Sequence, residues 1–241
     1  MLNTAFLASL FLIPLAIGAP AVDIEERQAP CQNVHIFLAR GTDEPYPGRQ
    51  SSLASAICSG LPSCGYENIN YPANFNTYCT SIYAGITGGL SQITAYANRC
   101  PNSKIVLSGY SQGAQLIGDI LGGGGGQSLG CTQQSNSALN PATSPGNKSK
   151  SFSLILAAAL FFGDPRHAAN QAYNTGTGAS RNGINPRNGA QLTSLNRFSN
   201  KIRSWCLAGD NVCAQGTDPN AHTSYFNLFS QEAGAWVKTK V

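Results

Sequence analysis

Short runs of apolar, mostly branched residues predict two buried β-strands. They are Asn33–Ala39 (NVHIFLA) and Lys104–Ser108 (KIVLS), each bounded by polar residues. Between them, apolar residues recur at steps of three and four, which is the spacing of one face of an amphipathic helix. This apolar stripe consists of Ile82, Ile86, Leu90, Ile93 and Ala97. The order of elements is therefore strand, helix, strand.

The same alternation continues to the end of the chain. AQLIGDIL (114–121) predicts a helix that glycine ends, and LILAAALFF (154–162) predicts a further strand. Leu195–Arg203 predicts a helix that leads into IRSWCLA (202–208), the last strand, and Tyr225–Val237 predicts a closing helix that docks on the sheet. Strands alternating with helices predict one α/β domain, with a parallel sheet covered by helices on both faces.

A polar segment between the second helix and its following strand interrupts this order. The run GGGGG (122–126) and the residues after it predict a long loop, which is tolerable if Cys131 is tied down. Asn147 begins the sequon Asn-Lys-Ser and is a candidate glycosylation site on this loop.

The N-terminal residues have the composition of a targeting segment. An apolar stretch from Ala5 to about Ala16, followed by small residues, predicts a signal peptide over residues 1–19 and secretion to the extracellular space. A membrane anchor is the rival interpretation, but the apolar run is too short to span a bilayer, and we expect no stable membrane association. Residues 20–27 form a candidate pro-segment, which leaves residues 28–241 as the domain.

Eight cysteines follow the signal segment, an even number that predicts up to four disulfides in an oxidising compartment. No C-x-x-C pair and no closely spaced histidines occur, so a metal site is not expected. After Arg27 there are 14 Lys and Arg and 8 Asp and Glu, a net charge of 14 − 8 = +6. These basic residues are scattered singly, which disfavours nucleic-acid binding. We expect a monomer without a cofactor.

The motif Gly-Tyr-Ser-Gln-Gly at 109–113 matches G-x-S-x-G. Five letters are a weak pattern in a chain rich in Gly and Ser, but here a buried strand precedes them and a helix follows. That context predicts a nucleophile elbow, with Ser111 raised above the sheet at a helix N-terminus that favours a developing oxyanion. The rival interpretation is a glycine-rich turn capped by a serine.

A serine nucleophile needs a base, and the chain has three histidines. His35 alternates within a strand and is expected to be packed and hydrogen-bonded. His222 lies in a polar loop before the last helix, and Asp210, at the end of the last strand, is the candidate acid that orients it. His167 with Asp164 is the competing pair, although three residues on one turn are more typical of a local structural hydrogen bond.

Two further features of the segment around Asp210 bear on this choice. A disulfide between Cys206 and Cys213 would fix the backbone of Asp210. Asp218, which precedes a proline, is expected to be a turn residue.

With these residues identified, the chain resembles the fungal cutinase and acetylxylan esterase family of secreted serine esterases. The resemblance rests on HIFLARGTDE, CPNSKIVLSGYSQGAQ, FFGDPRH, and CLAGDNVC with AHTSY beyond it. It implies a single-domain α/β-hydrolase with a central, mainly parallel five-stranded sheet and no lid domain. It also implies Ser111 as nucleophile, His222 as general base, Asp210 as orienting acid, and Thr42 with Gln112 as the oxyanion hole.

The resemblance further implies two disulfides, Cys31–Cys100 and Cys206–Cys213. The four cysteines that remain allow three pairings. Of these we favour Cys58–Cys64 together with Cys79–Cys131, which closes the long loop.

The expected function is hydrolysis of carboxylic esters in plant cell-wall polymers through an acyl-enzyme. The segment between acid and base, NVCAQGTDPNA, is mostly polar, which favours acetyl or short-chain esters on xylan over cutin, an aliphatic polyester. YPANFNTY and Tyr110 offer aromatic side chains that would suit sugars or acyl chains equally. Two rivals remain: a non-catalytic secreted protein that binds carbohydrate or a host partner, and a glycosidase, which needs two positioned carboxylates.

Overall fold

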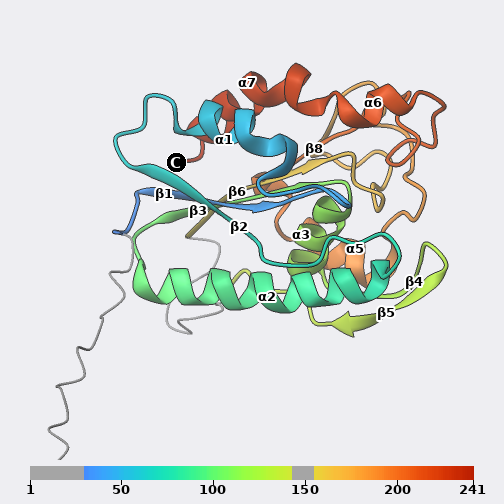
Figure 1. The fold of residues 1–241 in the computed structure, drawn as a ribbon, viewed down its shortest axis with the longest axis horizontal. Coiled ribbons are helices and arrows are strands. Elements are labelled where there is room, and N and C mark those ends of the chain that lie inside the picture. The colour runs from blue at the N-terminus through green and yellow to red at the C-terminus, as the bar shows by residue number, and fades with distance from the viewer. Residues whose placement is uncertain (1–29, 143–154) are drawn as a thin grey trace, which may run out of the picture. The chain divides into compact units, whose positions relative to one another are not determined.

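The computed structural model describes residues 30–142 and 155–241. Its centre is a six-stranded sheet in the order β2-β1-β3-β6-β8-β7, and every neighbouring pair is parallel. Figure 1 shows the twisted sheet between two layers of helices. In chain order the strands are β1 (Val34–Ala39), β2 (Cys64–Asn68), β3 (Lys104–Tyr110), β6 (Leu156–Phe162), β7 (Asn174–Thr175) and β8 (Ile202–Trp205).

Each face of the sheet is covered by its own group of helices, because the central strands are apolar on both sides. One layer holds α1 (Ser51–Cys58) and α7 (Tyr225–Lys238), and the other holds α2 (Tyr78–Arg99), α3 (Gln112–Gly122) and α5 (Gly189–Asn196). Within β1, Ile36 and Leu38 pack into the core under α1 and α7, while Phe37 packs into the core on the opposite side. The α/β fold expected from the alternating pattern is confirmed.

The observed sheet has six strands and not the expected five, because it includes the two-residue strand β7. The apolar pattern along the chain revealed neither β7 nor β2. This strand, CGYEN, pairs only with β1 at an edge of the sheet, and its side chains are half-buried or exposed. An edge strand carries no continuous apolar run, because it is not covered on both faces.

The prediction of a loop from residue 122 was wrong for its first part. The glycines begin a β-hairpin, in which β4 (Gly124–Ser128) pairs antiparallel with β5 (Cys131–Asn136). Gly123, Gly125 and Gly126 have φ values between 82° and 114°, a backbone conformation that glycine adopts at little cost. These glycines allow the chain to leave α3 and form the hairpin at once.

The predicted helix over 195–203 was also misplaced. The helix α5 ends at Asn196, a short 3-10 helix spans Ser199–Lys201, and β8 begins at Ile202. Leu195, Phe198 and Ile202 are all buried. Their three- and four-residue spacing mimics a helix, although Leu195 lies in α5, Phe198 in the turn after it and Ile202 in β8.

Four disulfides join the cysteines in the pairs favoured from the sequence. They are Cys31–Cys100, Cys58–Cys64, Cys79–Cys131 and Cys206–Cys213. Cys79 lies at the start of α2 and Cys131 at the start of β5, so this bond fastens the hairpin to the long helix.

The predicted signal peptide, the pro-segment up to Arg27 and the sequon at Asn147 lie outside the described residues. No helix within residues 30–142 and 155–241 is long and apolar enough to cross a membrane.

An ion cluster is buried beside α3. The carboxylate of Asp119, which is 0 % exposed, accepts hydrogen bonds from Arg166 at 3.0 Å and Arg187 at 2.7 Å. Arg187 also lies 3.6 Å from Asp164. Burial lowers the pKa of Arg166, whereas Asp119 and Asp164 outweigh burial at Arg187 and raise its pKa. The cluster ties α3 to the segment after β6 and to the segment before α5.

Asp119→Ala should destabilise the protein strongly, because it leaves two buried guanidinium groups without their shared carboxylate. We expect a loss of about 3–5 kcal/mol in the free energy of unfolding, measured in urea with the disulfides intact. Glu67→Ala is the control, since Glu67 is half-exposed and lies 3.7 Å from His35; it should cost less than about 1 kcal/mol. Equal losses in the two variants would contradict the role of the cluster.

Candidate active site

Ser111 sits on a sharp turn between β3 and α3. Its φ and ψ are 53° and −119°, a conformation that costs free energy in a residue with a side chain and is held by the surrounding structure. The Ser111 N–H donates to the carbonyl of Phe162 at the end of β6. The hydroxyl is thereby presented at the carboxyl end of the central strands, where parallel α/β sheets place their ligands.

The two glycines of the motif are required by close packing. A methyl group at Gly109 would overlap the carbonyl of Gly113, and a methyl group at Gly113 would overlap the carbonyl of Ala39 at the end of β1. The first turn of α3 therefore rests directly on the neighbouring strand. Any side chain at either position would push the helix away from the sheet and move Ser111 with it.

The structure brings Ser111, His222 and Asp210 into one hydrogen-bonded chain. His222 Nε2 lies 3.0 Å from Ser111 Oγ, and His222 Nδ1 lies 2.9 and 3.0 Å from the two carboxylate oxygens of Asp210. His222 belongs to the short helix α6 (Pro219–Thr223), which Asp218 caps by accepting a hydrogen bond from the Asn220 N–H. Asp218 thus has a local structural role, as its position before proline suggested.

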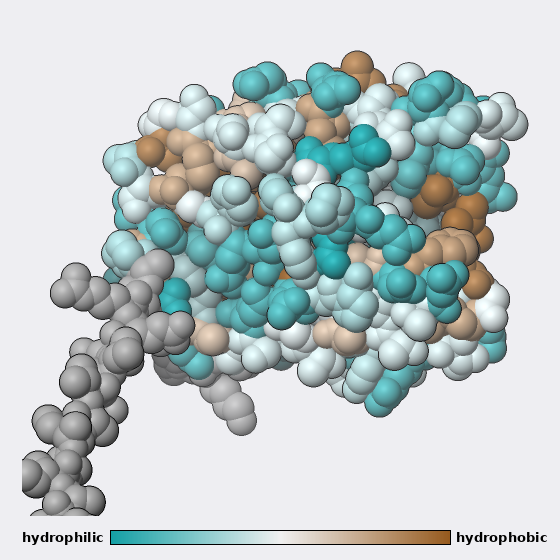
Figure 2. Space-filling model, in the orientation of Figure 1, coloured by the Kyte–Doolittle hydropathy of each residue, from teal (hydrophilic) through white to brown (hydrophobic). Residues whose placement is uncertain are grey.

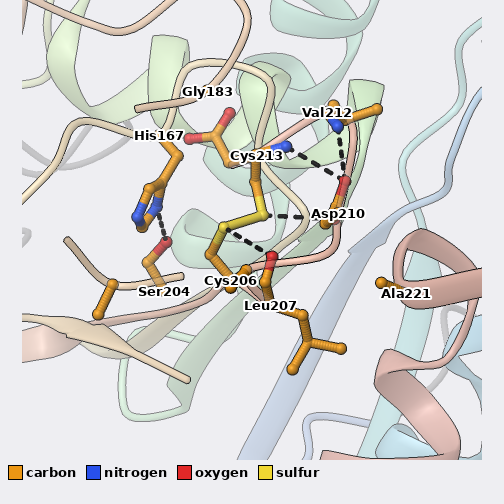
Figure 3. Close-up of a disulfide and its surroundings, with 12 residues drawn as sticks. His167, Gly183, Ser204, Cys206, Leu207, Asp210, Val212, Cys213 and Ala221 are labelled. Carbon is orange, nitrogen blue, oxygen red and sulfur yellow. Dashed lines mark hydrogen bonds between the residues drawn. A yellow bond between two sulfur atoms is a disulfide. The ribbon is translucent and has the colours of Figure 1, made fainter. Parts of the chain in front are cut away.

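The loop after β8 fixes the carboxylate of Asp210, which is fully buried. The N–H groups of Val212 and Cys213 donate to Oδ1 at 2.6 and 3.3 Å. Figure 3 shows the disulfide Cys206–Cys213 beside this carboxylate. The Cys213 sulfur is 3.3 Å from Oδ2, but a disulfide sulfur carries no proton, so this is a packing contact. The disulfide closes the loop that aims the two N–H groups.

The environment keeps Asp210 ionised. Burial by itself would raise the pKa of this carboxyl, but the hydrogen bonds and charge of His222, with smaller contributions from Tyr225 and Val212, outweigh burial and lower its pKa. A carboxylate that stays negative across neutral pH holds the imidazole with its proton on Nδ1, which leaves Nε2 free to accept a proton from Ser111.

Of the two predicted oxyanion residues, Gln112 directly follows Ser111 and Thr42 lies in the turn after β1. Gln112 is the first residue of α3, so its N–H has no carbonyl of a preceding helical turn to pair with. Thr42 lies in the turn after β1, where the next residue, Asp43, donates its N–H to the carbonyl of Ala73. The side chain of Gln112 reaches Asn74, which follows Ala73, at 3.4 Å. One loop therefore contacts both halves of the candidate oxyanion site.

The chain is similar to known proteins in both sequence and structure. Residues 30–241 match the family model described as Cutinase. The chain belongs to the cutinase family. It is 33% identical to acetylxylan esterase 2 of Talaromyces purpureogenus over 98% of this chain and 97% of that protein. It is 31% identical to cutinase 11 of Verticillium dahliae over 97% of this chain and 77% of that protein.

Solved structures lead to the same family. The catalytic core domain of acetyl xylan esterase from Trichoderma reesei superposes with a TM-score of 0.75 at 30% identity, covering 88% of this chain and all of that one. A cutinase-like protein from Cryptococcus sp. superposes with a TM-score of 0.62 at 21% identity, which supports the fold alone. The parallel sheet with helices on both faces is thus the family's architecture.

The remaining histidines of this cutinase-family chain are engaged elsewhere. His35 is buried on β1, where Nδ1 bonds Gln32 at 2.8 Å and the ring stacks on Tyr96. His167 is buried with Nδ1 3.1 Å from Ser204, and burial lowers its pKa. The His167 N–H bonds the backbone carbonyl of Asp164, which is the local structural contact expected for that pair. Neither histidine contacts Ser111.

Tyr225 was expected only as part of the closing helix that docks on the sheet, but the structure places it against Asp210. Its hydroxyl donates to Asp210 Oδ2 at 2.5 Å and accepts the N–H of Leu207 at 3.1 Å. Burial and the charge of Asp210 raise the pKa of Tyr225, so the phenol stays protonated and donates. The only available signal was its position in AHTSY, three residues after His222 on the following helical turn.

Tyr110 also differs from expectation. Its ring was expected to suit a sugar or an acyl chain, but Tyr110 is 4 % exposed, and its hydroxyl donates to the backbone carbonyl of His222 at 2.9 Å. Gly163, at φ 59°, lies under the imidazole, where a methyl group would approach the ring to 2.8 Å. Tyr110 and Gly163 therefore support the position of His222 and do not contribute to a binding surface.

Within the described ranges, no group of three metal-binding side chains is found.

Tyr225→Phe should lower the free energy of unfolding, and the loss relative to wild type should be larger at neutral pH than in acid. A carboxyl whose folded-state pKa is lowered adds stability above its unfolded-state pKa, and this stability is lost as the pH falls through the folded-state pKa. Removal of the Tyr225 donor raises the pKa of Asp210 and shrinks this contribution. The free energy of unfolding of both proteins, measured near pH 7 and near pH 3, should therefore differ more at the higher pH.

Tyr110→Phe is the matched control for this prediction. It also removes a buried phenol hydroxyl beside the site, but one that donates to a backbone carbonyl. Its effect should be the same at both pH values. A pH-independent effect of Tyr225→Phe would mean that this phenol does not stabilise the ionised carboxylate.

Proposed function

We propose that this protein is a secreted serine esterase that removes acetyl groups from xylan. The observation that carries the proposal is the hydrogen-bonded chain from Ser111 Oγ through His222 to the buried Asp210. This arrangement fits nucleophilic acyl transfer, because a serine hydroxyl is a weak nucleophile until an adjacent base takes its proton. Similarity to acetylxylan esterases at 33% and 31% identity supports the choice of ester.

The geometry suits a two-step reaction. Ser111 Oγ attacks the acetyl carbonyl as His222 Nε2 accepts its proton, and Asp210 stabilises the imidazolium. The carbonyl oxygen becomes an oxyanion, to which the N–H groups of Gln112 and Thr42 would donate, with the Thr42 hydroxyl as a third donor. The imidazolium protonates the xylan oxygen as its bond to the acetyl carbon breaks, which leaves an acetyl ester on Ser111. Water then attacks this ester while His222 takes its proton; the bond to Ser111 Oγ breaks, His222 returns the proton to Oγ, and acetate leaves.

The surface near the base favours a polar substrate. In the segment between Asp210 and His222, the residues from Thr217 to Asn220 are exposed, as is Gln215. A long aliphatic chain would gain little by contact with them, whereas hydroxyl groups of a sugar can hydrogen-bond there. Hydrolysis of cutin is the second candidate, because cutinase 11 of Verticillium dahliae is also a relative at 31% identity.

Secretion is part of the proposal. All eight cysteines are paired, and disulfides of this number persist in oxidising surroundings. We place the signal peptide at residues 1–19 and the catalytic domain at residues 28–241.

A serine-directed organophosphate should label the wild-type protein, whereas Ser111→Ala should remain unlabelled. The same substitution should lower kcat on 4-nitrophenyl acetate by at least about a thousandfold, because the nucleophile is lost. Mass spectrometry of the labelled peptide identifies the site, and Ser108→Ala, on β3 before the turn, is the control. Full esterase activity in Ser111→Ala would overturn the mechanism, and a wild-type protein without labelling or activity would favour a non-catalytic binding protein.

The wild-type protein should release acetate from acetylated xylan faster than it releases acid from a film of a long-chain aliphatic polyester. The physical reason is the polar surface between Asp210 and His222. Acetate release and film hydrolysis are measured at equal enzyme concentration. Preference for the film would make the cutinase function the better assignment while leaving the serine mechanism intact.

A further inference from the structure

A groove lies beside the candidate active site, between the start of α2 and the tip of the hairpin β4–β5. Its volume is about 390 Å³, and no charged residue lines it. We call it the Phe75 groove. The side chains used in the argument are Phe75, Asn76, Thr77, Leu129 and Thr132.

Hydrogen bonds to the first turn of α3 connect both walls of this groove to the residues that follow Ser111. On the α2 side, the Tyr78 hydroxyl donates to Gln115 Oε1 at 2.9 Å. On the hairpin side, Gln115 Nε2 donates to Gln133 Oε1 at 3.0 Å and lies 3.4 Å from Ser128 Oγ. A single side chain, four residues after Ser111, therefore holds the two walls together.

A second connection joins the groove to the candidate oxyanion site. The carbonyl of Asn74, one residue before Phe75, lies 3.4 Å from the side-chain nitrogen of Gln112. Ser81 Oγ accepts the N–H of Asn74 at 3.1 Å and donates to Gln112 Oε1. Phe75, the first residue of the lining, is thus joined through Asn74 to the residue that follows Ser111.

The chemistry of the lining fits a neutral sugar chain. Phe75 is 62 % exposed and Leu129 is 42 % exposed, and both line the same groove, whereas exposed apolar side chains without a ligand are typically scattered singly. Threonine hydroxyls and the Asn76 amide surround them. An uncharged mixture of aromatic face, hydroxyl and amide groups matches a pyranose ring, which has apolar C–H faces and hydroxyl edges. Figure 2 shows hydrophobic residues, in brown, in separate groups among hydrophilic ones on the visible face, with the darkest of them toward the right edge.

The groove is also held in shape before any ligand arrives. The disulfide Cys79–Cys131 joins its two walls directly, and the Phe75 ring packs edge-to-face on Tyr78 with centroids 6.5 Å apart. A preformed site loses little conformational entropy on binding. Rigid walls therefore favour recognition of a stiff polymer over a flexible aliphatic chain.

We propose that the Phe75 groove binds the unsubstituted sugar residues of xylan next to the acetylated residue, with one xylose ring stacked on Phe75. This inference rests on the proposed acetylxylan esterase function and assigns the polymer-binding surface of that site. The groove makes no contact with the reacting atoms, so it raises the affinity for the polymer and leaves hydrolysis of a small ester unaffected.

The first test compares two substrates in two variants. Phe75→Ala should lower kcat/KM on acetylated xylan about tenfold, mainly through KM, which corresponds to about 1.4 kcal/mol of lost binding. On 4-nitrophenyl acetate, Phe75→Ala should retain at least about half of the wild-type kcat/KM, which is the effect of a neutral surface substitution. Leu228→Ala removes a side chain of similar exposure, 58 %, on α7 outside the groove and should change neither substrate.

A second pair of variants separates ring stacking from simple hydrophobic contact. Phe75→Tyr keeps the aromatic face and should behave as wild type on acetylated xylan, whereas Phe75→Leu keeps the apolar character and should behave as Phe75→Ala. If Phe75→Leu is as active as wild type and both hydrolyse an aliphatic polyester film, the groove binds acyl chains and the inference is wrong.

Binding without chemistry distinguishes this inference from the proposed function. Xylohexaose without acetyl groups should bind Ser111→Ala in isothermal titration calorimetry, and the double variant with Phe75→Ala should bind about tenfold more weakly. Equal binding by both proteins would contradict the proposed sugar binding in the Phe75 groove but would leave the proposed esterase function in place. If the wild-type protein did not hydrolyse 4-nitrophenyl acetate, the proposed esterase function itself would be wrong.

Discussion

The active-site architecture depends on one close approach, that of the α3 backbone to the end of β1. Gly113 lies against the carbonyl of Ala39, and Gly109 lies against Gly113 itself, so neither position has room for a side chain. This contact sets the distance from helix to sheet, and that distance determines where Ser111 and Gln112 lie. The positive φ of Ser111 is the cost of so sharp a turn, and the parallel strands on both sides of β3 hold it in place.

The acid and base depend on a different kind of constraint. Asp210 is buried, and a buried carboxylate is tolerable only when hydrogen bonds replace the water it has lost. Two backbone N–H groups, the phenol of Tyr225 and the imidazole of His222 serve this purpose. The groups that keep Asp210 ionised are thus also the groups that aim it, and electrostatics and geometry at this position cannot be separated.

Sequence patterns predicted the central elements because burial on both faces leaves a strong signal. The strands β1, β3 and β6 are buried along almost their whole length and mostly apolar, and α2 and α7 carry clear apolar stripes. The edge strand β2 and the glycine-rich hairpin gave no such signal, since their stability comes from backbone pairing and from the disulfide Cys79–Cys131. Elements stabilised by tertiary contacts are difficult to infer from local composition.

The site was predictable to a similar degree. The motif and its context indicated Ser111, with His222 and Asp210 as candidate base and acid beside the competing pair His167 and Asp164. Resemblance to a known family then implied the first set, and the structure brings its three members together within hydrogen-bond distance. Tyr225 and Gly163 were missed because their importance lies in what they contact and leaves no mark in composition. Tyr110 was misjudged for the same reason: an aromatic residue beside a serine motif serves equally as a lining or as a support, and only its burial distinguishes the two.

Acid, base and the phenol that supports the acid all lie in one short stretch of chain, from Asp210 to Tyr225. The residues that hold this group together, Cys213 and Tyr225, point inward, while Gln215 and Thr217 between them face solvent. A substitution at an exposed position such as Thr217 therefore alters the rim of the site without touching the buried acid or the phenol that supports it. Along this stretch evolution is free to change substrate preference by exchanging surface residues, without rebuilding the catalytic machinery beneath them.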